Sequence, residues 1–257
     1  MDMRWKSRPA AARKVQLKLF GDCRLTIDGR PIQGVPASLF RVAAYLVLGG
    51  NGGIQPRHRV GALLWSDADD GKAAANMRQA LARIRHLQEE HGFSFIGANF
   101  SMLQLLDEGD VQCDLTDFVD YLKGTLPLTP VELCSLYDGE LLGGLGPGGE
   151  GFEEWLFPHR EKFMVEAVDH IAAGLAPQMG LSESDRGICA RRLLEIDPYH
   201  ELALRVLMQE AANRQQIGRL THLYESMRHL LGEDLGIQPS QETQTLYVDL
   251  MQRLKAS

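Results

Sequence analysis

The sequence lacks the features that mark membrane, secreted and disulfide-bonded proteins. It has no run of 18 or more apolar residues, and its basic N-terminal stretch through Lys14 has no apolar segment of the kind found in signal peptides. Its few cysteines show neither a Cys-x-x-Cys pair nor the Cys/His spacing of zinc ligands. They are Cys23, Cys113, Cys134 and Cys189. We therefore expect a soluble, cytoplasmic protein with buried thiols and no bound metal.

An assembled catalytic or phosphate-binding motif is also lacking. The histidines are scattered, and no Ser/His/Asp arrangement or catalytic pair of carboxylates stands out. The glycine-rich stretch at 143–151 contains neither a GxGxxG motif between a strand and a helix nor a Gly-Lys-Ser/Thr sequence. We expect this stretch to be a flexible loop between helices. The sequence predicts a protein that is not an enzyme and needs no cofactor.

Charge is distributed unevenly along the chain. The 257 residues are 44% hydrophobic, enough to form two domain cores. Residues 1–106 carry 15 Lys and Arg against 8 Asp and Glu, whereas residues 107–257 carry 12 against 26. The overall net charge of −7 therefore combines a basic half with an acidic half. A basic first half attracts polyanions such as nucleic acids, and the acidic half repels them.

Strand patterns lie at both ends of the basic half. Residues 15–32 alternate apolar and polar side chains around a Gly21-Asp22 turn, which predicts a small antiparallel sheet. Residues 93–106 form two short runs around Gly97-Ala98-Asn99, which predicts a hairpin. Apolar residues at helical spacing predict three helices between them, over 38–49, 57–65 and 72–88. A sheet, three helices and a hairpin, in this order, are typical of a winged helix with an N-terminal sheet.

The acidic half is helical from Leu115 almost to its end. The helical pattern is interrupted at the glycine-rich stretch and at Asp197-Pro198. After Pro198, large and small apolar residues are spaced as in a tetratricopeptide repeat, with helices near 201–214 and 217–231. The residues of this pattern are Leu204, Leu207, Met208, Ala211, Leu220, Tyr224 and Met227. Residues 163–196 are interpreted as a degenerate copy. The expected fold class is α+β followed by all-α.

Three segments together resemble a known family. Trp65 is followed by an acidic loop and by ANMRQALARIR at 75–85, DLTDF follows at 114–118, and LLGEDLGIQPSQETQTL stands at 230–246. They resemble the Streptomyces antibiotic regulatory protein-like transcriptional activators, which join an OmpR-like winged helix to a bacterial transcriptional activation domain. The resemblance implies a DNA-binding winged helix at 15–110 and a tetratricopeptide-like activation domain at 114–257. The basic stretch at 1–14 has no counterpart in the family and is interpreted as a flexible tail.

The third predicted helix is the candidate reading element. A helix in the major groove reads guanine with Arg or Lys and adenine with Gln or Asn, while flanking cations meet phosphates. The candidate DNA-binding residues on the helix are Lys72, Asn76, Arg78, Gln79, Arg83, Arg85 and His86. Asn99 and Ser101 at the hairpin tip are candidates for contact with the minor groove or backbone. The alternative is an ordinary solvated face of a basic helix.

Partners follow from the resemblance. It implies double-stranded promoter DNA, RNA polymerase bound through an acidic loop at 66–71, and a homodimer that binds direct repeats. The candidate polymerase contacts are Asp67, Asp69 and Asp70. Two other functions remain open: a tetratricopeptide-type adaptor for protein interactions, and a regulator that senses a small molecule in its helical domain.

Overall fold

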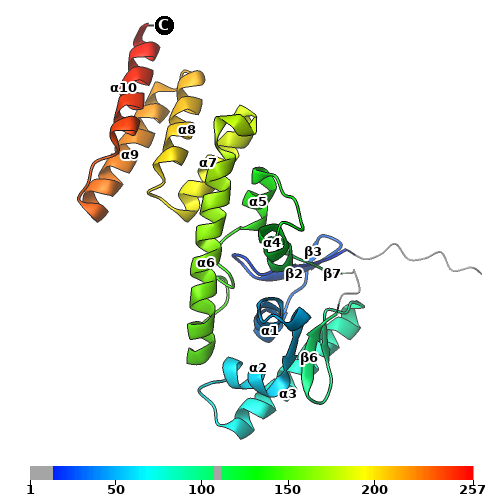
Figure 1. Ribbon diagram of the computed structural model, residues 1–257. Coiled ribbons are helices and arrows are strands. Elements are labelled where there is room, and N and C mark those ends of the chain that lie inside the picture. The colour runs from blue at the N-terminus through cyan, green and yellow to red at the C-terminus, as the bar shows by residue number, and fades with distance from the viewer. Residues whose placement is uncertain (1–13, 107–110, 257) are drawn as a thin grey trace, which may run out of the picture. The chain divides into compact units, whose positions relative to one another are not determined.

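The computed structural model describes residues 14–106 and 111–256, which form two compact units. Among the described residues, the first unit comprises 14–106, 111–126 and 136–161, and the second comprises 127–135 and 162–256. Apart from Lys14, the predicted tail at 1–14 lies outside the described residues. Each unit is described by itself below (Figure 1).

The first unit contains two small sheets and several helices. Its strands are β1 (Val15–Lys18), β2 (Arg24–Ile27), β3 (Arg30–Pro31), β4 (Ile54–Pro56), β5 (Ile96–Ala98), β6 (Met102–Leu105) and β7 (Val111–Cys113). Its helices are α1 (Ala37–Leu48), the short η1 (Asn51–Gly53), α2 (Arg57–Leu64), α3 (Asp70–His91), α4 (Asp114–Leu122) and the first part of α6 (Glu150–Gly174).

The N-terminal sheet has the strand order β3-β2-β1-β7. Strands β1 and β2 pair antiparallel as predicted, and β7 adds to β1 in parallel, with Val15 opposite Val111. The chain after residue 110 therefore returns to the first sheet. Phe118 of α4 is fully buried and packs against Phe20, with 5.2 Å between ring centroids. The first compact unit thus extends beyond the predicted boundary at 110–114.

The second sheet has the order β4-β6-β5 and lies with α1, α2 and α3. Helices α1 and α2 begin and end within one residue of their predicted bounds. The predicted hairpin is formed by β5 and β6, and its tip is Asn99–Ser101 rather than the Gly97-Ala98-Asn99 turn expected from the sequence. Three helices followed by a hairpin form a winged helix, so the predicted fold of this half is confirmed.

Helix α3 is longer than predicted. It runs from Asp70 to His91, whereas the sequence pattern predicted 72–88. Its start is set by the side chain of Asp69, which accepts a hydrogen bond of 2.9 Å from the backbone N–H of Lys72. Its end is set by Gly92, whose φ of +67° closes the helix in the left-handed conformation. The loop predicted at 66–71 is therefore shorter, because Asp70 and Gly71 belong to the helix.

The second unit is all-helical. It contains α5 (Pro130–Leu136), the second part of α6, η2 (Pro177–Met179), α7 (Glu183–Ile196), α8 (Glu201–Asn213), α9 (Ile217–Leu235) and α10 (Gln241–Ala256). Helix α8 packs against α7, α9 and α10. The core residues are Leu204, Met208, Ala211, Ala212, Leu220, Met227, Leu231 and Leu250. Five of these match the repeat pattern predicted from the sequence, and the tetratricopeptide-like helical domain is confirmed.

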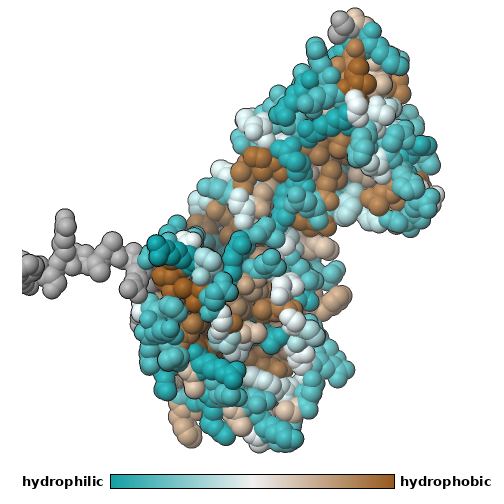
Figure 2. All heavy atoms as spheres, turned by 180° about the vertical axis from the view of Figure 1, so that it is seen from behind, coloured by the Kyte–Doolittle hydropathy of each residue, from teal (hydrophilic) through white to brown (hydrophobic). Residues whose placement is uncertain are grey.

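Figure 2 shows hydrophilic residues over most of the visible surface.

Three of the four cysteines are buried as predicted. Cys113, Cys134 and Cys189 are buried free thiols, and Cys23 is half-buried. Burial raises the pKa of both Cys23 and Cys113 to about 12. Because the thiolate is the reactive form, these two sulfurs are poor nucleophiles near neutral pH.

A half-buried carboxylate joins the N-terminal sheet to α4. The side chain of Asp114, the first residue of α4, accepts hydrogen bonds from the backbone N–H groups of Leu19 (2.8 and 3.0 Å) and Phe20 (3.0 Å). It also accepts one of 2.7 Å from the N–H of Leu115. Burial raises the pKa of Asp114 to about 6, although these hydrogen bonds act in the opposite direction.

A buried amide joins α3 to the hairpin. Gln88 is 8% exposed, and its Nε2 donates to the carbonyl of Ile96 at 3.1 Å. Its Oε1 accepts from the N–H groups of Phe95 (3.1 Å) and Ile96 (2.8 Å). One side chain thus satisfies three backbone groups at the start of β5, and it fixes the hairpin against α3.

Replacing Asp114 should change how stability depends on pH. Between its unfolded and folded pKa values, Asp114 holds a proton in the folded chain that it loses on unfolding, so the wild type loses stability as the pH rises through this range. Asp114→Asn removes this titration. It also leaves a backbone N–H without a carboxylate oxygen as acceptor, which should lower the free energy of unfolding by about 1–3 kcal/mol. Urea unfolding from pH 4 to pH 7 should show the advantage of the wild type shrinking up to about pH 6. Parallel pH profiles would contradict this assignment.

Replacing Gln88 should destabilise the first unit. Gln88→Ala leaves three buried backbone groups without partners, and each costs about 1–3 kcal/mol when water does not replace the bond. The adjacent exposed Glu89→Ala is the matched control and should change the free energy of unfolding by less than about 0.5 kcal/mol. Amide hydrogen exchange should show faster exchange in β5 and β6 of the Gln88 variant. Equal exchange in both variants would exclude this role for Gln88.

Candidate nucleic-acid interface

Helix α3 separates buried and exposed residues as the sequence predicted. Its buried stripe faces the core of the first unit and comprises Ala73, Met77, Ala80, Leu81, Ile84, Leu87 and Gln88. Every predicted DNA-binding residue of this helix lies off that stripe. Asn76 is half-buried, while Lys72, Arg78, Gln79, Arg83, Arg85 and His86 are exposed. The structure thus brings these seven side chains together on one helix.

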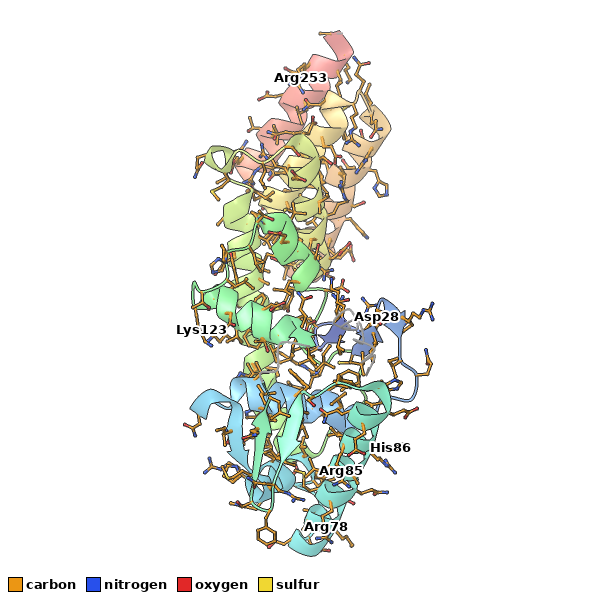
Figure 3. The ribbon with its side chains drawn as sticks, turned by 90° about the vertical axis from the view of Figure 1, so that its right-hand side faces the viewer. Asp28, Arg78, Arg85, His86, Lys123 and Arg253 are labelled. Atoms are coloured by element: carbon orange, nitrogen blue, oxygen red, sulfur yellow. The ribbon has the colours of Figure 1, made fainter. Side chains whose placement is uncertain are left out.

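The exposed residues of α3 form two edges. At 100° per residue, Arg78 and Arg85 share the edge next to the hairpin, and Lys72, Asn76 and Arg83 share the opposite edge. Gln79 and His86 lie between the two edges. Figure 3 labels Arg78, Arg85 and His86 along the helix, with side chains that project outward. A helix with cations on both edges and an amide between them has the layout needed to place bases centrally and phosphates on both sides.

Three of the candidate DNA-binding side chains have acidic neighbours. Arg85 Nε lies 3.7 Å from Glu89 Oε1, His86 Nε2 lies 3.8 Å from Glu90 Oε2, and Lys72 Nζ lies 3.4 Å from Asp69 Oδ2. Such exposed pairs contribute about 0–1 kcal/mol, so these side chains can change partners at little cost. Arg78 and Arg83 have no acidic partner among the described residues.

The hairpin tip is shaped by Asn99. Its Oδ1 accepts hydrogen bonds from the backbone N–H groups of Ser101 (3.0 Å) and Met102 (2.8 Å). The carboxamide oxygen therefore holds the turn, and only the Nδ2 end of Asn99 is left to meet a ligand. Both Asn99 and Ser101 are exposed.

Arg57 is a site residue that sequence reasoning missed. Its Nη1 donates to the carbonyl of Asn99 at 3.0 Å, and its backbone N–H donates to the carbonyl of Ser101 at 2.8 Å. The sequence indicated only that Arg57 begins the second helix. It gave no signal for this contact, because Arg57 and the hairpin tip are far apart in the chain and meet only through the fold. Arg57 supplies the cation that the hairpin sequence itself lacks.

A groove of about 610 Å³ separates α3 from the hairpin. The charged side chains that line it are all basic, namely Arg57, Arg78 and Arg85. The remaining lining residues are Leu81, Ala82, Ile84, Ile96, Gly97, Ala98, Asn99 and Phe100. Arg57, Arg78 and Phe100 also line a second hollow, whose other lining residues come mainly from α2 and the first half of α3. The two hollows therefore have the basic residues Arg57 and Arg78 in common.

The acidic loop before α3 caps two helices. Asp69 caps α3, and the pKa of its carboxyl is lowered by the hydrogen bond from the N–H of Lys72. Asp67 Oδ1 accepts from the N–H of Glu150 at 3.2 Å, and Ser66 Oγ accepts from the N–H of Gly151 at 2.9 Å, at the start of α6. Two of the three predicted polymerase contacts thus have a structural role in addition. Asp70, in the first turn of α3, is exposed.

The glycine-rich stretch lies between helices as predicted but makes specific hydrogen bonds. Arg41 Nη2 donates to the carbonyls of Gly146 (2.6 Å) and Pro147 (3.1 Å). The N–H of Gly148 donates to Glu153 Oε1 at 2.5 Å. Gly149 fits because a Cβ there would lie 2.9 Å from Ser66 Oγ. The small residues let the start of α6 approach the acidic loop.

Neither a metal centre nor a membrane span is found in the part of the chain that the structure describes. No three side chains of His, Cys, Asp or Glu gather there in a way that could hold a metal ion. Every helix of residues 14–106 and 111–256 is too short or too polar to cross a bilayer.

Comparison with protein families finds a match in the helical half. Residues 133–251 match the family described as the bacterial transcriptional activator domain. No curated protein sequence matches the chain.

Comparison with solved structures supports the architecture of the whole chain. A structure of EmbR from Mycobacterium tuberculosis, in complex with a low-affinity phosphopeptide, matches with a TM-score of 0.55 and 18% sequence identity. The match covers 94% of this chain and 66% of the EmbR chain, slightly under two thirds of it. The EmbR structure thus supports the predicted order of a winged helix followed by a helical domain, and residues 133–251 match the model of the bacterial transcriptional activator domain, as the resemblance predicted.

Proposed function

We propose that this chain is a sequence-specific DNA-binding transcriptional activator of the bacterial cytoplasm and not an enzyme. In this proposal, the winged helix in the first unit selects a promoter, and the all-helical second unit mediates contacts with RNA polymerase and with a second copy of the chain. The observation that carries the proposal is α3, a well-capped helix whose exposed side presents cations on both edges and an amide between them.

In the proposed complex α3 lies in the major groove. Arg78 and Gln79 read base edges, because Arg matches guanine and Gln matches adenine with paired hydrogen bonds. Lys72, Asn76, Arg83, Arg85 and His86 set the register, mainly on phosphates. The hairpin tip with Asn99 and Ser101 contacts the adjacent minor groove or backbone, with Arg57 beside it. Two copies bind direct repeats as a homodimer.

The proposed polymerase contact is the acidic loop before α3. Asp67 and Asp69 accept hydrogen bonds from helix N-termini, and Asp70 is exposed at the start of α3. Asp70 is therefore the residue of this loop that is most available to a partner. Because this loop lies next to α3, RNA polymerase that contacts it would be recruited to the promoter that α3 has bound.

Changing the reading residues should abolish sequence preference. We expect the full chain to bind a duplex selected from a randomised pool in preference to its scrambled sequence. Affinity should fall on the order of 10³-fold between 50 and 200 mM salt if about six phosphates are contacted. Arg78→Ala/Gln79→Ala should weaken specific binding by about 1–3 kcal/mol per lost base contact and remove the preference. Electrophoretic mobility shift at several salt concentrations measures both effects.

The control for this test is Arg30→Ala, which removes the same positive charge from β3, outside α3 and the hairpin. It should retain the preference for the selected duplex. The proposal fails if the folded wild type binds no duplex at low salt, or if the double variant discriminates between the two duplexes as well as the wild type does. The first result would favour the adaptor function instead.

Asp70→Asn should separate recruitment from DNA binding. Removing a negative charge close to the duplex should leave DNA binding equal or slightly tighter, whereas transcription from a promoter that carries the selected site should fall. In vitro run-off transcription with bacterial RNA polymerase measures the second effect, and Glu154→Gln on α6 is the control exposed acid. Wild-type activation by Asp70→Asn would exclude this residue as a polymerase contact.

A further inference from the structure

The most exposed large apolar side chain among the described residues is Phe100, at the tip of the β5–β6 hairpin. Its exposed fraction is 98%, so it contributes almost nothing to the core of the first unit. An exposed Phe forgoes the stabilisation that burial would give, and a solitary aromatic side chain on a tip is suited to insertion into a partner. The fold itself gives no reason for an aromatic residue at this position.

The backbone that carries Phe100 is held on both sides. The N–H of Asn99 donates to the carbonyl of Met102 at 3.0 Å, and Asn99 Oδ1 accepts from the two N–H groups that follow Phe100. Arg57 binds the carbonyls of Asn99 and Ser101. These hydrogen bonds order the three-residue tip, so little conformational entropy is lost when Phe100 enters a partner.

The surroundings of Phe100 are basic. Phe100 lines both hollows beside the tip, and so do Arg57 and Arg78. Arg85 lines the first hollow, and Asp70 is the acid of the second. An apolar side chain flanked by guanidinium groups is complementary to DNA, in which stacked bases lie between two rows of phosphates.

From this arrangement, and resting on the proposed function, we propose that Phe100 is a wedge that enters the minor groove beside the α3 site and partly unstacks one base step. Arg57, which is bonded to the tip, holds a phosphate beside the inserted ring, while Arg78 remains on the base that it reads from α3. Minor-groove wedges of this kind kink the duplex by about 20–90°. The complex is therefore bent at the point where Phe100 enters.

The wedge also gives the protein a specificity that needs no hydrogen bond to a base. Pyrimidine–purine steps such as TA and CA unstack more easily than other steps, and A-tracts are stiff. Phe100 therefore selects a flexible step at a fixed distance from the bases read by Arg78 and Gln79.

The test uses the full chain and the duplex selected by the wild type. Dyes on the two ends of the duplex report bending by energy transfer, and 2-aminopurine placed at successive positions reports unstacking by increased fluorescence. Phe100→Ala should weaken binding about 5- to 150-fold, as expected from the loss of base–aromatic stacking. It should also abolish the bend and the 2-aminopurine signal. Phe100→Leu should retain most of the bend, because leucine also acts as an apolar wedge.

The matched control is Phe157→Ala, which removes the same ring from an exposed position on α6, where Phe157 is 65% exposed. It should bind and bend DNA as the wild type does. Replacing the flexible step of the duplex with an A-tract should weaken the wild type and leave Phe100→Ala unaffected. Circular dichroism should show that both Phe variants fold, because both side chains are exposed.

Two outcomes overturn the wedge. If the wild type binds without bending the duplex, or if Phe100→Ala bends it equally, Phe100 is not inserted. In that case the proposed function still stands, provided that binding depends on Arg78. If the wild type binds no duplex at all, the wedge and the proposed function fail together.

Discussion

The side-chain amide of Gln88 holds α3 and the β5–β6 hairpin in one geometry, and the candidate interface depends on that geometry. It binds both the carbonyl and the N–H of Ile96 and the N–H of Phe95. The same helix that presents Arg78 and Arg85 to solvent therefore also fixes the position of the hairpin tip. Because Gln88 is buried, its hydrogen bonds face little competition from water. The groove between the two elements consequently has basic residues from α3 on one side and Arg57 on the other.

A second constraint concerns the acidic loop. Ser66 and Asp67 accept hydrogen bonds from the first turn of α6, and Asp69 caps α3. A loop of few residues thus sets the start of two helices, one of which is the proposed reading helix. This arrangement leaves Asp70 as the acid without a capping role, and it explains why glycines stand before α6: bulkier residues would prevent the loop from approaching the helix N-terminus.

Much of the fold was predictable from local sequence patterns. The spacing of Met77, Ala80, Leu81, Ile84 and Leu87 fixed the buried side of α3, since a 3.6-residue period leaves little choice about which face meets the core. The remaining residues of α3 could therefore be predicted to be exposed. The ends of α3 were less predictable, because the capping role of Asp69 appears only when its side chain meets the backbone of Lys72. Contacts between distant segments were not predictable at all. The parallel pairing of β7 with β1, the bond from Arg57 to the hairpin tip and the isolation of Phe100 all depend on the assembled fold.

In the proposed complex, α3 lies in the major groove and the hairpin lies in the adjacent minor groove. Methylation protection on the selected duplex distinguishes the two grooves, because dimethyl sulfate modifies guanine N7 in the major groove and adenine N3 in the minor groove. We expect protection of guanine N7 over one short segment and protection of adenine N3 immediately beside it, with the guanine protection lost in Arg78→Ala/Gln79→Ala. Binding of the duplex without any protection in the major groove would exclude α3 as the reading helix.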